Sequence, residues 1–527
     1  MKQRITYVVT DPDSFNPEQI EVQKGSEGKG DTYVLTRVKA AKEHRITLGL
    51  DELAQAPIDI EVLRKWHELH VRWAPETPNA AVAPFTSRVS PGLHIFYTPS
   101  TELKSPDLCL DVRSIFGSAN KHFKCTTSNE TAISMPMLSE RFTMSTALQY
   151  YSPFSGNDWS ASKIAGWLQD MTGEKSTPSY VDIDYDAISQ AVVCTAVWSD
   201  SPSRIGWTDQ FTASDEESTM EIGVLSHEPN PDPEDIQFGG FLTVLGRDDK
   251  PKPTRFQTPT RHYPLLTSSP FNPKTNPRLS PLTYRASLNR PTGLHPTLTL
   301  TLPVAHLTAP SPSCKLHTHL TLPSALFIDK HQFNDPLFLA SHHLTALRSI
   351  AGATDLEAPD WVVPEWGSAA LFELSHPEEE EEDAEERPHT PATGRGADWN
   401  ISIPLHLRYQ PATSASHAPV QLPWPVVFWA CRADEGEKHA LNPFDRRHLG
   451  YEALFGPKTR FMHVRPAGEA AMLVETIDVP VLDTRKAGWV EGGTVAVVVV
   501  AFVGLCWVLF GRVGRAKKER EGVKKTQ

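Results

Sequence analysis

Two aspartates are the residues whose type and spacing best fit catalysis. Asp182-Ile183-Asp184 places two carboxylates at alternate positions, and residues i and i+2 of a strand share a face. Clustered carboxylate oxygens are the ligands that hard divalent cations prefer, and many glycosyltransferases use Asp-x-Asp to hold a metal on a sugar-nucleotide donor. The pair leaves open a metal-dependent glycosyltransferase, although the motif is short and acidic residues are common in this chain.

Histidines offer a second kind of site. His317 and His319 would lie on one face of a strand, within reach of a shared zinc ion. No spacing fixes a third ligand, however, and His and Thr alternating with Leu is typical of a strand with one solvated face. The sequence also lacks a nucleophile elbow, a P-loop, a dinucleotide fingerprint and Cys-x-x-Cys. We therefore expect no catalytic residues, no metal and no cofactor.

The six cysteines are too few for a disulfide scaffold in a chain of 527 residues. Cys506 lies in an apolar C-terminal segment, and the five that remain leave at least one thiol free. Cys314 and Cys431 each adjoin a predicted strand, so a disulfide between them is one pairing that the sequence permits.

The elements that must position these residues are mostly strands. Short β-branched and aromatic runs bounded by turn residues predict them. The clearest runs are Ile5–Val9, Tyr33–Leu35, His94–Tyr97, Val192–Val197, Leu298–Leu302, Leu316–Leu322, Ala369–Leu374, Ile401–Tyr409, Val426–Cys431, Arg460–Val464 and Met472–Ile477. Few helices are predicted, for example Ala161–Met171. We expect a mainly β protein with β-sandwich-like domains.

Composition shifts divide the chain. Eight prolines between 251 and 281 exclude a regular strand or helix there, which predicts an N-terminal β-rich region 1–246, a Pro-rich linker 247–290 and a second β-rich domain 291–483. Within the latter lies an acidic loop, 376–398, whose residues 378–386 include eight acids in nine positions and must be solvated.

An apolar segment near the C-terminus is the strongest signal in the sequence. Residues 492–511 carry no charge, and at about 1.5 Å per residue they form a helix of roughly 30 Å, the thickness of the hydrocarbon core. Trp489 and Trp507 lie toward its two ends, where indole rings favour the interface. We predict one transmembrane helix at 492–511, after a juxtamembrane segment at 484–491.

The basic tail, 512–527, indicates the orientation. It carries seven Lys or Arg and two Glu, a net charge of +5, so the rest of the chain carries −18. The positive-inside rule places this tail in the cytosol, and an acidic remainder argues against nucleic acid as a partner. The chain ends Lys524-Lys525-Thr526-Gln527, which resembles the dilysine retrieval signal of endoplasmic reticulum membrane proteins. We expect a single-pass endoplasmic reticulum protein with a lumenal N-terminal bulk.

Two features bear on that topology. No cleavable signal peptide is seen in the first residues, so a tail-anchored protein with its bulk in the cytosol is the alternative, and how the N-terminus is translocated stays open. Two sequons place possible glycans on Asn129 and Asn400. About two sequons are expected by chance, so they permit a lumenal glycoprotein without requiring one.

An aromatic stretch of the second domain offers a candidate partner-binding surface. Trp424, Phe428 and Trp429 lie beside rigid prolines. Aromatic side chains in such a setting are either core residues or interface anchors, and core is the commoner outcome.

Several stretches between residues 290 and 510 occur in an order typical of one family. They are 293–297 (Gly-Leu-His-Pro-Thr), 314–316 (Cys-Lys-Leu), 322–330, 354–359 with 361–364, 403–409, 423–431 and 442–444 (Asn-Pro-Phe). In this order, before a single C-terminal span, they resemble the PIG-X/Pbn-type accessory subunit of glycosylphosphatidylinositol (GPI) mannosyltransferase I in its fungal form. The first 245 residues resemble the less regular N-terminal extension of fungal members.

The resemblance implies a role without catalysis. Such proteins bind and stabilise a multi-spanning catalytic subunit of the PIG-M type, which moves the first mannose from dolichyl-phosphate mannose onto the GPI precursor. Fungal members are also linked to the folding or stability of other lumenal proteins, a chaperone-like function. The alternative is a single-pass lumenal glycosyltransferase that uses Asp182 and Asp184 with a metal. One helix cannot form the cavity that a dolichol-linked donor needs, which favours the accessory subunit.

Overall fold

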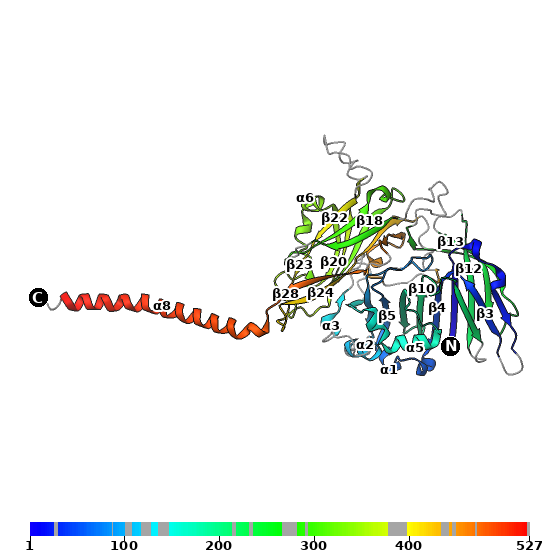
Figure 1. The fold of residues 1–527 in the computed structure, drawn as a ribbon, viewed down its shortest axis with the longest axis horizontal. Coiled ribbons are helices and arrows are strands. Elements are labelled where there is room, and N and C mark those ends of the chain that lie inside the picture. The colour runs from blue at the N-terminus through cyan, green and yellow to red at the C-terminus, as the bar shows by residue number, and fades with distance from the viewer. Residues whose placement is uncertain are drawn as a thin grey trace, which may run out of the picture. The chain divides into compact units, whose positions relative to one another are not determined.

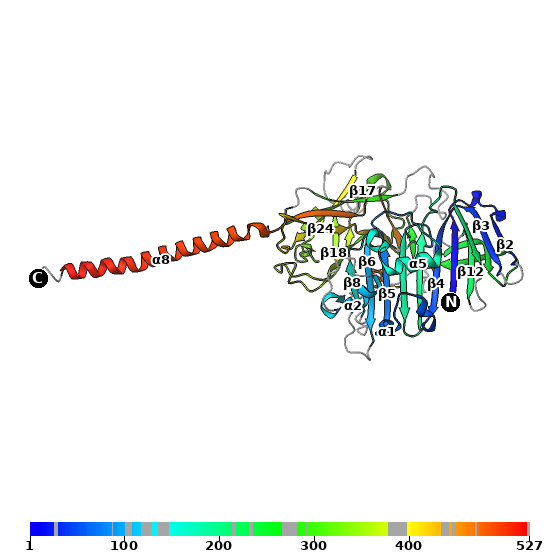
Figure 2. The ribbon, with the colours of Figure 1, turned by 60° about the horizontal axis from the view of Figure 1, so that its bottom comes forward.

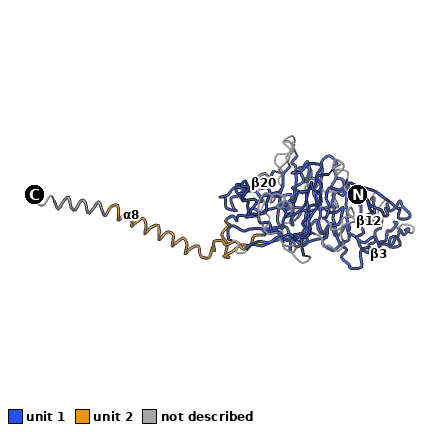
Figure 3. The backbone as a smooth tube through the Cα atoms, turned by 90° about the horizontal axis from the view of Figure 1, so that it is seen from above, with its two compact units in different colours: residues 1–408, 421–477 blue, residues 409–420, 478–527 orange. Residues whose placement is uncertain are grey.

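The computed structural model describes most of the chain. The described residues are 1–25, 30–86, 88–100, 108–116, 128–134, 147–212, 218–230, 235–265, 282–289, 293–377, 398–433, 442–444, 449–468 and 472–523. The chain forms two compact units, unit 1 (residues 1–408 and 421–477) and unit 2 (residues 409–420 and 478–527), which Figure 3 draws in different colours. The predicted mainly β fold, with few helices and one C-terminal helix of transmembrane length, is confirmed.

The first half of unit 1 is built on an eleven-stranded sheet. In spatial order its strands are β14 (Lys252–Pro259), β13 (Asp235–Val244), β12 (Thr219–Glu228), β1 (Lys2–Val9), β4 (Ala40–Gly49), β10 (Ala191–Trp198), β9 (Tyr180–Asp186), β5 (Trp66–Ala74), β6 (Gly92–Pro99), β8 (Leu148–Ser152) and β7 (Ile133–Ser134). β1 pairs in parallel with β12, and the other neighbours are antiparallel.

Both faces of the sheet are buried at its inner strand β1. In β1, Ile5, Tyr7 and Val9 belong to one apolar cluster, whereas Val8 on the opposite face belongs to another, because side chains alternate along a strand. A small sheet of β11 (Trp207–Thr212), β3 (Thr32–Val38) and β2 (Ile20–Gln23) supplies further residues of the first cluster.

Short helices cover the first cluster. They are α1 (Ile60–Leu63), α2 (Leu108–Phe116), α4 (Gly156–Ser160) and α5 (Lys163–Thr172), and Figures 1 and 2 show α1 and α5 beside strands β4 and β5. A further short helix is α3 (Ser128–Thr131). Ser162 caps α5 by accepting a hydrogen bond from the backbone N–H of Ala165, and Gly173 ends it in the left-handed conformation. Ile164 and Leu168, one turn apart, bury the same face.

The second half of unit 1 contains a six-stranded sheet. Its order is β15 (His262–Pro264), β26 (Thr459–His463), β25 (Val426–Arg432), β18 (Lys315–Pro323), β21 (Gly367–Leu374) and β20 (Leu344–Gly352). A four-stranded sheet has the order β22 (Asp398–Pro404), β17 (Thr297–Pro303), β16 (Thr283–Leu288) and β27 (Arg465–Pro466). The remaining pairs and helix are β19 (Leu326–Phe327) with β23 (His406–Leu407), β24 (His417–Pro423) with β28 (Val474–Pro480), and α6 (Pro336–Ser341).

The expectation that the proline-rich part of the linker, between residues 251 and 281, contains no regular strand is wrong. β14 and β15 lie within that range, and β16 follows directly after it. β14 and β15 are edge strands of their sheets, and an edge strand tolerates proline because one side of its backbone needs no ladder hydrogen bond. The range also does not separate two compact units, since most of the residues on either side of it fall in unit 1.

Unit 2 contains the membrane-length helix. After a 3₁₀ turn (Thr484–Lys486), α8 runs from Ala487 to Val523. The segment Thr484–Phe510 has a mean hydropathy of 2.6 and no buried residues, and it is the one helix in the described part of the chain that is long and apolar enough to cross a membrane. The predicted span lies within this helix.

Candidate functional site

The two aspartates of the candidate metal motif lie on β9, opposite basic residues of β5. Cross-strand pairing sets Asp182 against Arg72 and Asp184 against His70. Arg72 donates two hydrogen bonds to Asp182, from Nε to Oδ1 at 2.5 Å and from Nη2 to Oδ2 at 2.6 Å. Both side chains are almost completely buried. Asp182 therefore forms a bidentate ion pair inside the protein, which neutralises the buried guanidinium.

Asp184 is paired as well. Its Oδ1 lies 2.8 Å from Nδ1 of His70. Burial alone lowers the pKa of His70, but hydrogen bonds to Asp184 and Glu68 outweigh it and raise this pKa to about 9, so the imidazole is protonated at neutral pH. A divalent cation at this position would have to displace two cationic partners, and the arrangement fits ion pairing better than metal binding.

Among the residues that the structure describes, no group of three or more His, Cys, Asp or Glu side chains could hold a metal ion. His317 and His319 point from β18 into the protein, where each is less than 5% exposed. Burial lowers the pKa of His317 to about 4 and that of His319 to about 3. The prediction that the face of this strand carrying His317 and His319 is solvated is therefore wrong. β18 is a central strand, and both its faces are covered.

Part of the cover over the histidine face of β18 comes from the first sheet. His319 lies near His94 of β6, whose charge would lower the pKa of His319 further. The hydroxyl of Tyr451 donates to the backbone oxygen of Arg88 at 2.8 Å, and Trp366 Nε1 donates to the backbone oxygen of Gln149 at 2.9 Å.

Apolar contacts also join the two halves. Trp366 and Ala369 belong to the apolar cluster of the first sheet. Phe85 packs edge-on against Phe444 with ring centroids 5.7 Å apart. The two β-rich regions are thus one packed body.

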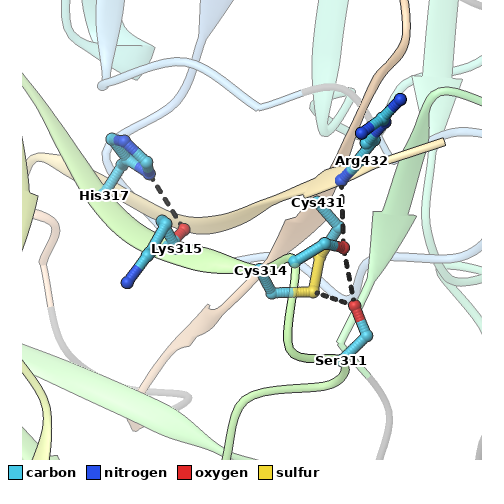
Figure 4. Close-up of a disulfide and its surroundings, with 7 residues drawn as sticks. Ser311, Cys314, Lys315, His317, Cys431 and Arg432 are labelled. Carbon is cyan, nitrogen blue, oxygen red and sulfur yellow. Dashed lines mark hydrogen bonds between the residues drawn. A yellow bond between two sulfur atoms is a disulfide. The ribbon is translucent and has the colours of Figure 1, made fainter. Parts of the chain in front are cut away.

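A disulfide links two neighbouring strands of the six-stranded sheet. Cys314, just before β18, is bonded to Cys431 at the end of β25, 117 residues away (Figure 4). This is the pairing that the sequence permitted. Cys109 is also disulfide-bonded, and the sequence does not predict this bond because spacing alone cannot assign partners. Cys194 and Cys506 are free thiols.

The aromatic stretch is core and not an exposed anchor. Trp424 is 6% exposed, and Phe428 and Trp429 are 0% exposed. Trp424 Nε1 donates to Oε1 of Glu475 at 3.2 Å, and Phe428 sits in a cluster of rings with Tyr451. These three side chains contact their own chain, so the candidate partner-binding surface is corrected to a structural role.

Of the remaining candidate residues, the structure describes the side chain of Asn400 alone. Asn400 is exposed on β22, an edge strand, and its Oδ1 accepts a hydrogen bond from Thr301. Asn129 falls in the short helix α3, but its side chain is outside the described residues. Lys524, Lys525 and the acidic run at 378–386 also lie outside them.

The two surface cavities described next are not lined by the aspartates of the candidate metal motif. An open cavity of about 620 Å³ is lined by four loop prolines, Trp198, Asp200 and Arg465, among others, and a second of about 720 Å³ lies between the α1 region and α2. Neither is lined by Asp182 or Asp184.

Comparison with known proteins gives a full-length match. A family model described as PIG-X / PBN1 matches residues 291–510. The chain is 40% identical to "Protein pbn1" of Emericella nidulans, over 98% of this chain and 97% of that protein. It is 38% identical to "Protein pbn1" of Aspergillus oryzae (97% and 96%) and 37% identical to that of Neurospora crassa (98% and 96%). A solved structure, "BspA_C_WT", matches with 8% identity and a TM-score of 0.12 over 81% of this chain and 95% of that chain, which is too low to support an argument.

Proposed function

The chain belongs to the PIG-X / PBN1 family, which is involved in GPI-anchor biosynthesis, and on that premise we propose that it is a non-catalytic subunit of GPI mannosyltransferase I. In this role it stabilises a multi-spanning catalytic subunit of the PIG-M type, which adds the first mannose to the GPI precursor. The observation that carries the proposal is the match to Pbn1 proteins over almost the whole chain.

The chemistry of the candidate motif supports a role without catalysis. Asp182 and Asp184, the best candidates for a metal-dependent transferase, are engaged by Arg72 and His70. A transferase that uses a dolichol-linked donor must also hold a long lipid, which takes several helices, whereas the described part of the chain offers one. In this proposal the catalytic groups belong to the partner.

We place the bulk of the chain in the lumen of the endoplasmic reticulum. The tail after residue 511 has a net charge of +5, which favours the cytosol. A lumenal unit 1 also suits the disulfides at Cys109 and between Cys314 and Cys431, because disulfides persist in an oxidising compartment. A chaperone-like action on other lumenal proteins would use the same lumenal unit.

Co-purification tests the partnership. The tagged full-length chain is immunoprecipitated from detergent-solubilised microsomes, and the bound proteins are identified by mass spectrometry. The matched control carries the same unit 1 on an unrelated membrane span. We expect the catalytic subunit to co-purify with the native full-length chain in an amount nearly equal to that of the chain itself. Recovery of folded, tagged protein without any multi-spanning mannosyltransferase would contradict the proposal.

Protease protection tests the topology. Protease added outside intact microsomes should remove only the basic tail, and endoglycosidase H should shift the band of the native chain but not that of a variant with Asn129→Gln and Asn400→Gln. Digestion of unit 1 in intact microsomes would place it in the cytosol instead.

A further inference from the structure

One arginine between the two halves of unit 1 lacks an acidic partner. Nη2 of Arg88 donates to the backbone oxygen of Asn79 at 3.1 Å, and its Nε is buried without a hydrogen-bond acceptor. No carboxylate in the described part of the chain lies within ion-pair distance of this guanidinium. Arg72, which lines a small cavity together with Arg88, differs because it is paired with Asp182. A buried charge is costly unless it is paired, so an anion beside Arg88 would be stabilised there.

A second arginine adds positive charge at the same place. Arg465 belongs to β27 and, like Arg88, has no carboxylate within ion-pair distance among the residues that the structure describes. Burial lowers the pKa of Arg88 to about 10, and the charge of Arg465 contributes to this, so Arg88 is still protonated at neutral pH. The other titratable groups that act on Arg88 are tyrosines, which are neutral at this pH. Two guanidinium groups without a facing carboxylate make this part of unit 1 positive.

The space beside these arginines consists of two adjoining cavities. The small one, of about 40 Å³, is lined by Arg88 and by Thr86, whose buried hydroxyl has no described hydrogen-bond partner. The large one is the open cavity of about 620 Å³ that Arg465 lines. The two cavities share three wall residues, Pro75, Asn79 and Ser179. One water molecule needs only about 10–15 Å³, so the small cavity has room for a larger polar group.

We propose that the two cavities bind a phosphorylated polyol or sugar, with its phosphate held by Arg88 and Arg465. Guanidinium groups bind phosphate oxygens through charge-assisted hydrogen bonds, and the hydroxyl of Thr86 is a further donor. The large cavity is also lined by short polar side chains that suit a ligand rich in hydroxyl groups: Thr77, Ser176, Thr177, Ser199 and Asp200. The inference goes beyond the proposed partnership and is independent of it.

The same chemistry occurs in two kinds of molecule. A soluble sugar phosphate carries a phosphate monoester, whereas the head group of an inositol lipid carries a phosphodiester. Both combine a phosphate with several hydroxyl groups, so the probes must distinguish them.

Calorimetric titration of the full-length chain in mild detergent tests the proposal. The probes are myo-inositol 1-phosphate, a monoester, and glycerophosphoinositol, a diester without acyl chains. We expect a phosphorylated probe to bind at least about tenfold more tightly than unphosphorylated myo-inositol, because hydrogen bonds to charged groups are the stronger ones. Tighter binding of the monoester would identify a soluble sugar phosphate, and tighter binding of the diester a lipid head group. Failure of both probes to bind, or equally tight binding of myo-inositol, would overturn the inference.

Substitution of the arginines assigns the site. Arg465→Met should weaken binding by at least about tenfold. The matched control is Arg285→Met, because Arg285 is exposed on β16, the strand beside β27, and lines neither cavity. Equal binding by these two variants would overturn the inference.

Arg88→Met separates a ligand-binding role from a structural one. It should abolish binding and yet leave the urea midpoint of the ligand-free chain nearly unchanged, because it removes a buried charge that the fold does not neutralise. Arg72→Met should lower that midpoint, because it leaves Asp182 buried without its partner. A midpoint for Arg88→Met as low as that for Arg72→Met would overturn the inference, because the fold itself would then depend on the charge of Arg88.

Discussion

Replacing Asp182 by Asn should destabilise unit 1 far more than replacing Asp184 by Asn. The change at 182 leaves Arg72 as a buried guanidinium without its bidentate carboxylate. Breaking a buried ion pair from one side costs about 3–5 kcal/mol, a large part of the roughly 5–15 kcal/mol that stabilises a typical domain. Asp184 has a side chain that is 36% exposed, and its partner can lose its proton, so Asp184→Asn should cost about 1 kcal/mol or less.

The assay is urea denaturation of the full-length chain in mild detergent, followed by tryptophan fluorescence. The urea concentration at the midpoint of unfolding should be much lower for Asp182→Asn than for the native chain, with little change in the slope of the transition. A matched control replaces both partners, Arg72→Met with Asp182→Leu. It should recover much of the loss, because an apolar pair of similar volume leaves no uncompensated buried charge.

The same assay separates ion pairing from metal binding. If Asp182 and Asp184 held a divalent cation together, manganese would raise the midpoint of the native chain, and either substitution would abolish that effect. Equal destabilisation by the two substitutions, or a manganese effect lost in both, would refute the reasoning.

Four further outcomes are expected. Cys314→Ser should lower the unfolding free energy by about 2–5 kcal/mol, because the bond closes a loop of more than 100 residues; a midpoint that equals that of the native chain under oxidising conditions would contradict this. Trp424→Ala should cost about 3–5 kcal/mol as a core truncation, and loss of partner binding at unchanged stability would contradict its assignment to the core. The pKa values of His317 and His319 lie below that of an unfolded His, about 6.5, so their contribution to stability is complete above that pH and falls as the pH drops toward 4. His319→Gln should therefore flatten the pH dependence of the urea midpoint by up to about 1.4 kcal/mol per pH unit, whereas an unchanged slope would show that His319 titrates normally. Asn400→Gln should leave the midpoint unchanged within about 0.5 kcal/mol, because Asn400 is exposed, and a large shift would reveal a structural role for its bond to Thr301.

Local patterns in the sequence predict individual strands and the C-terminal transmembrane helix. Alternation of apolar and polar residues in 316–322 predicts β18, and the uncharged run at 492–511 predicts the span inside α8. Both signals depend only on neighbouring residues, so they need no knowledge of distant contacts.

The partners of each residue could not be predicted in the same way. Arg72 and Asp182 meet because β5 lies beside β9 in one register, 110 residues apart along the chain, and no local pattern sets that register. Alternation likewise separates the two faces of β18 without saying what covers each. His319 is buried beside His94 of the first sheet, and His317 packs against the rings of Phe428 and Phe455; the sequence does not reveal either neighbour.

The proline-rich range shows a related limit. Eight prolines between 251 and 281 predict that this range contains no strand, yet β14 runs through two of them because it lies at a sheet edge. Whether a strand is central or at an edge depends on the topology of the whole sheet.

The central claim is that this chain stabilises a catalytic subunit and does not catalyse the transfer itself. The most direct test depletes the chain in cells and measures the amount of the PIG-M-type subunit together with the first mannosylation of the GPI precursor. An unpartnered membrane subunit is removed by quality control, so we expect the transferase and the mannosylation to fall together, and overexpression of the transferase to restore part of the activity. A transferase that persists at its normal amount but is inactive without this chain would contradict the account.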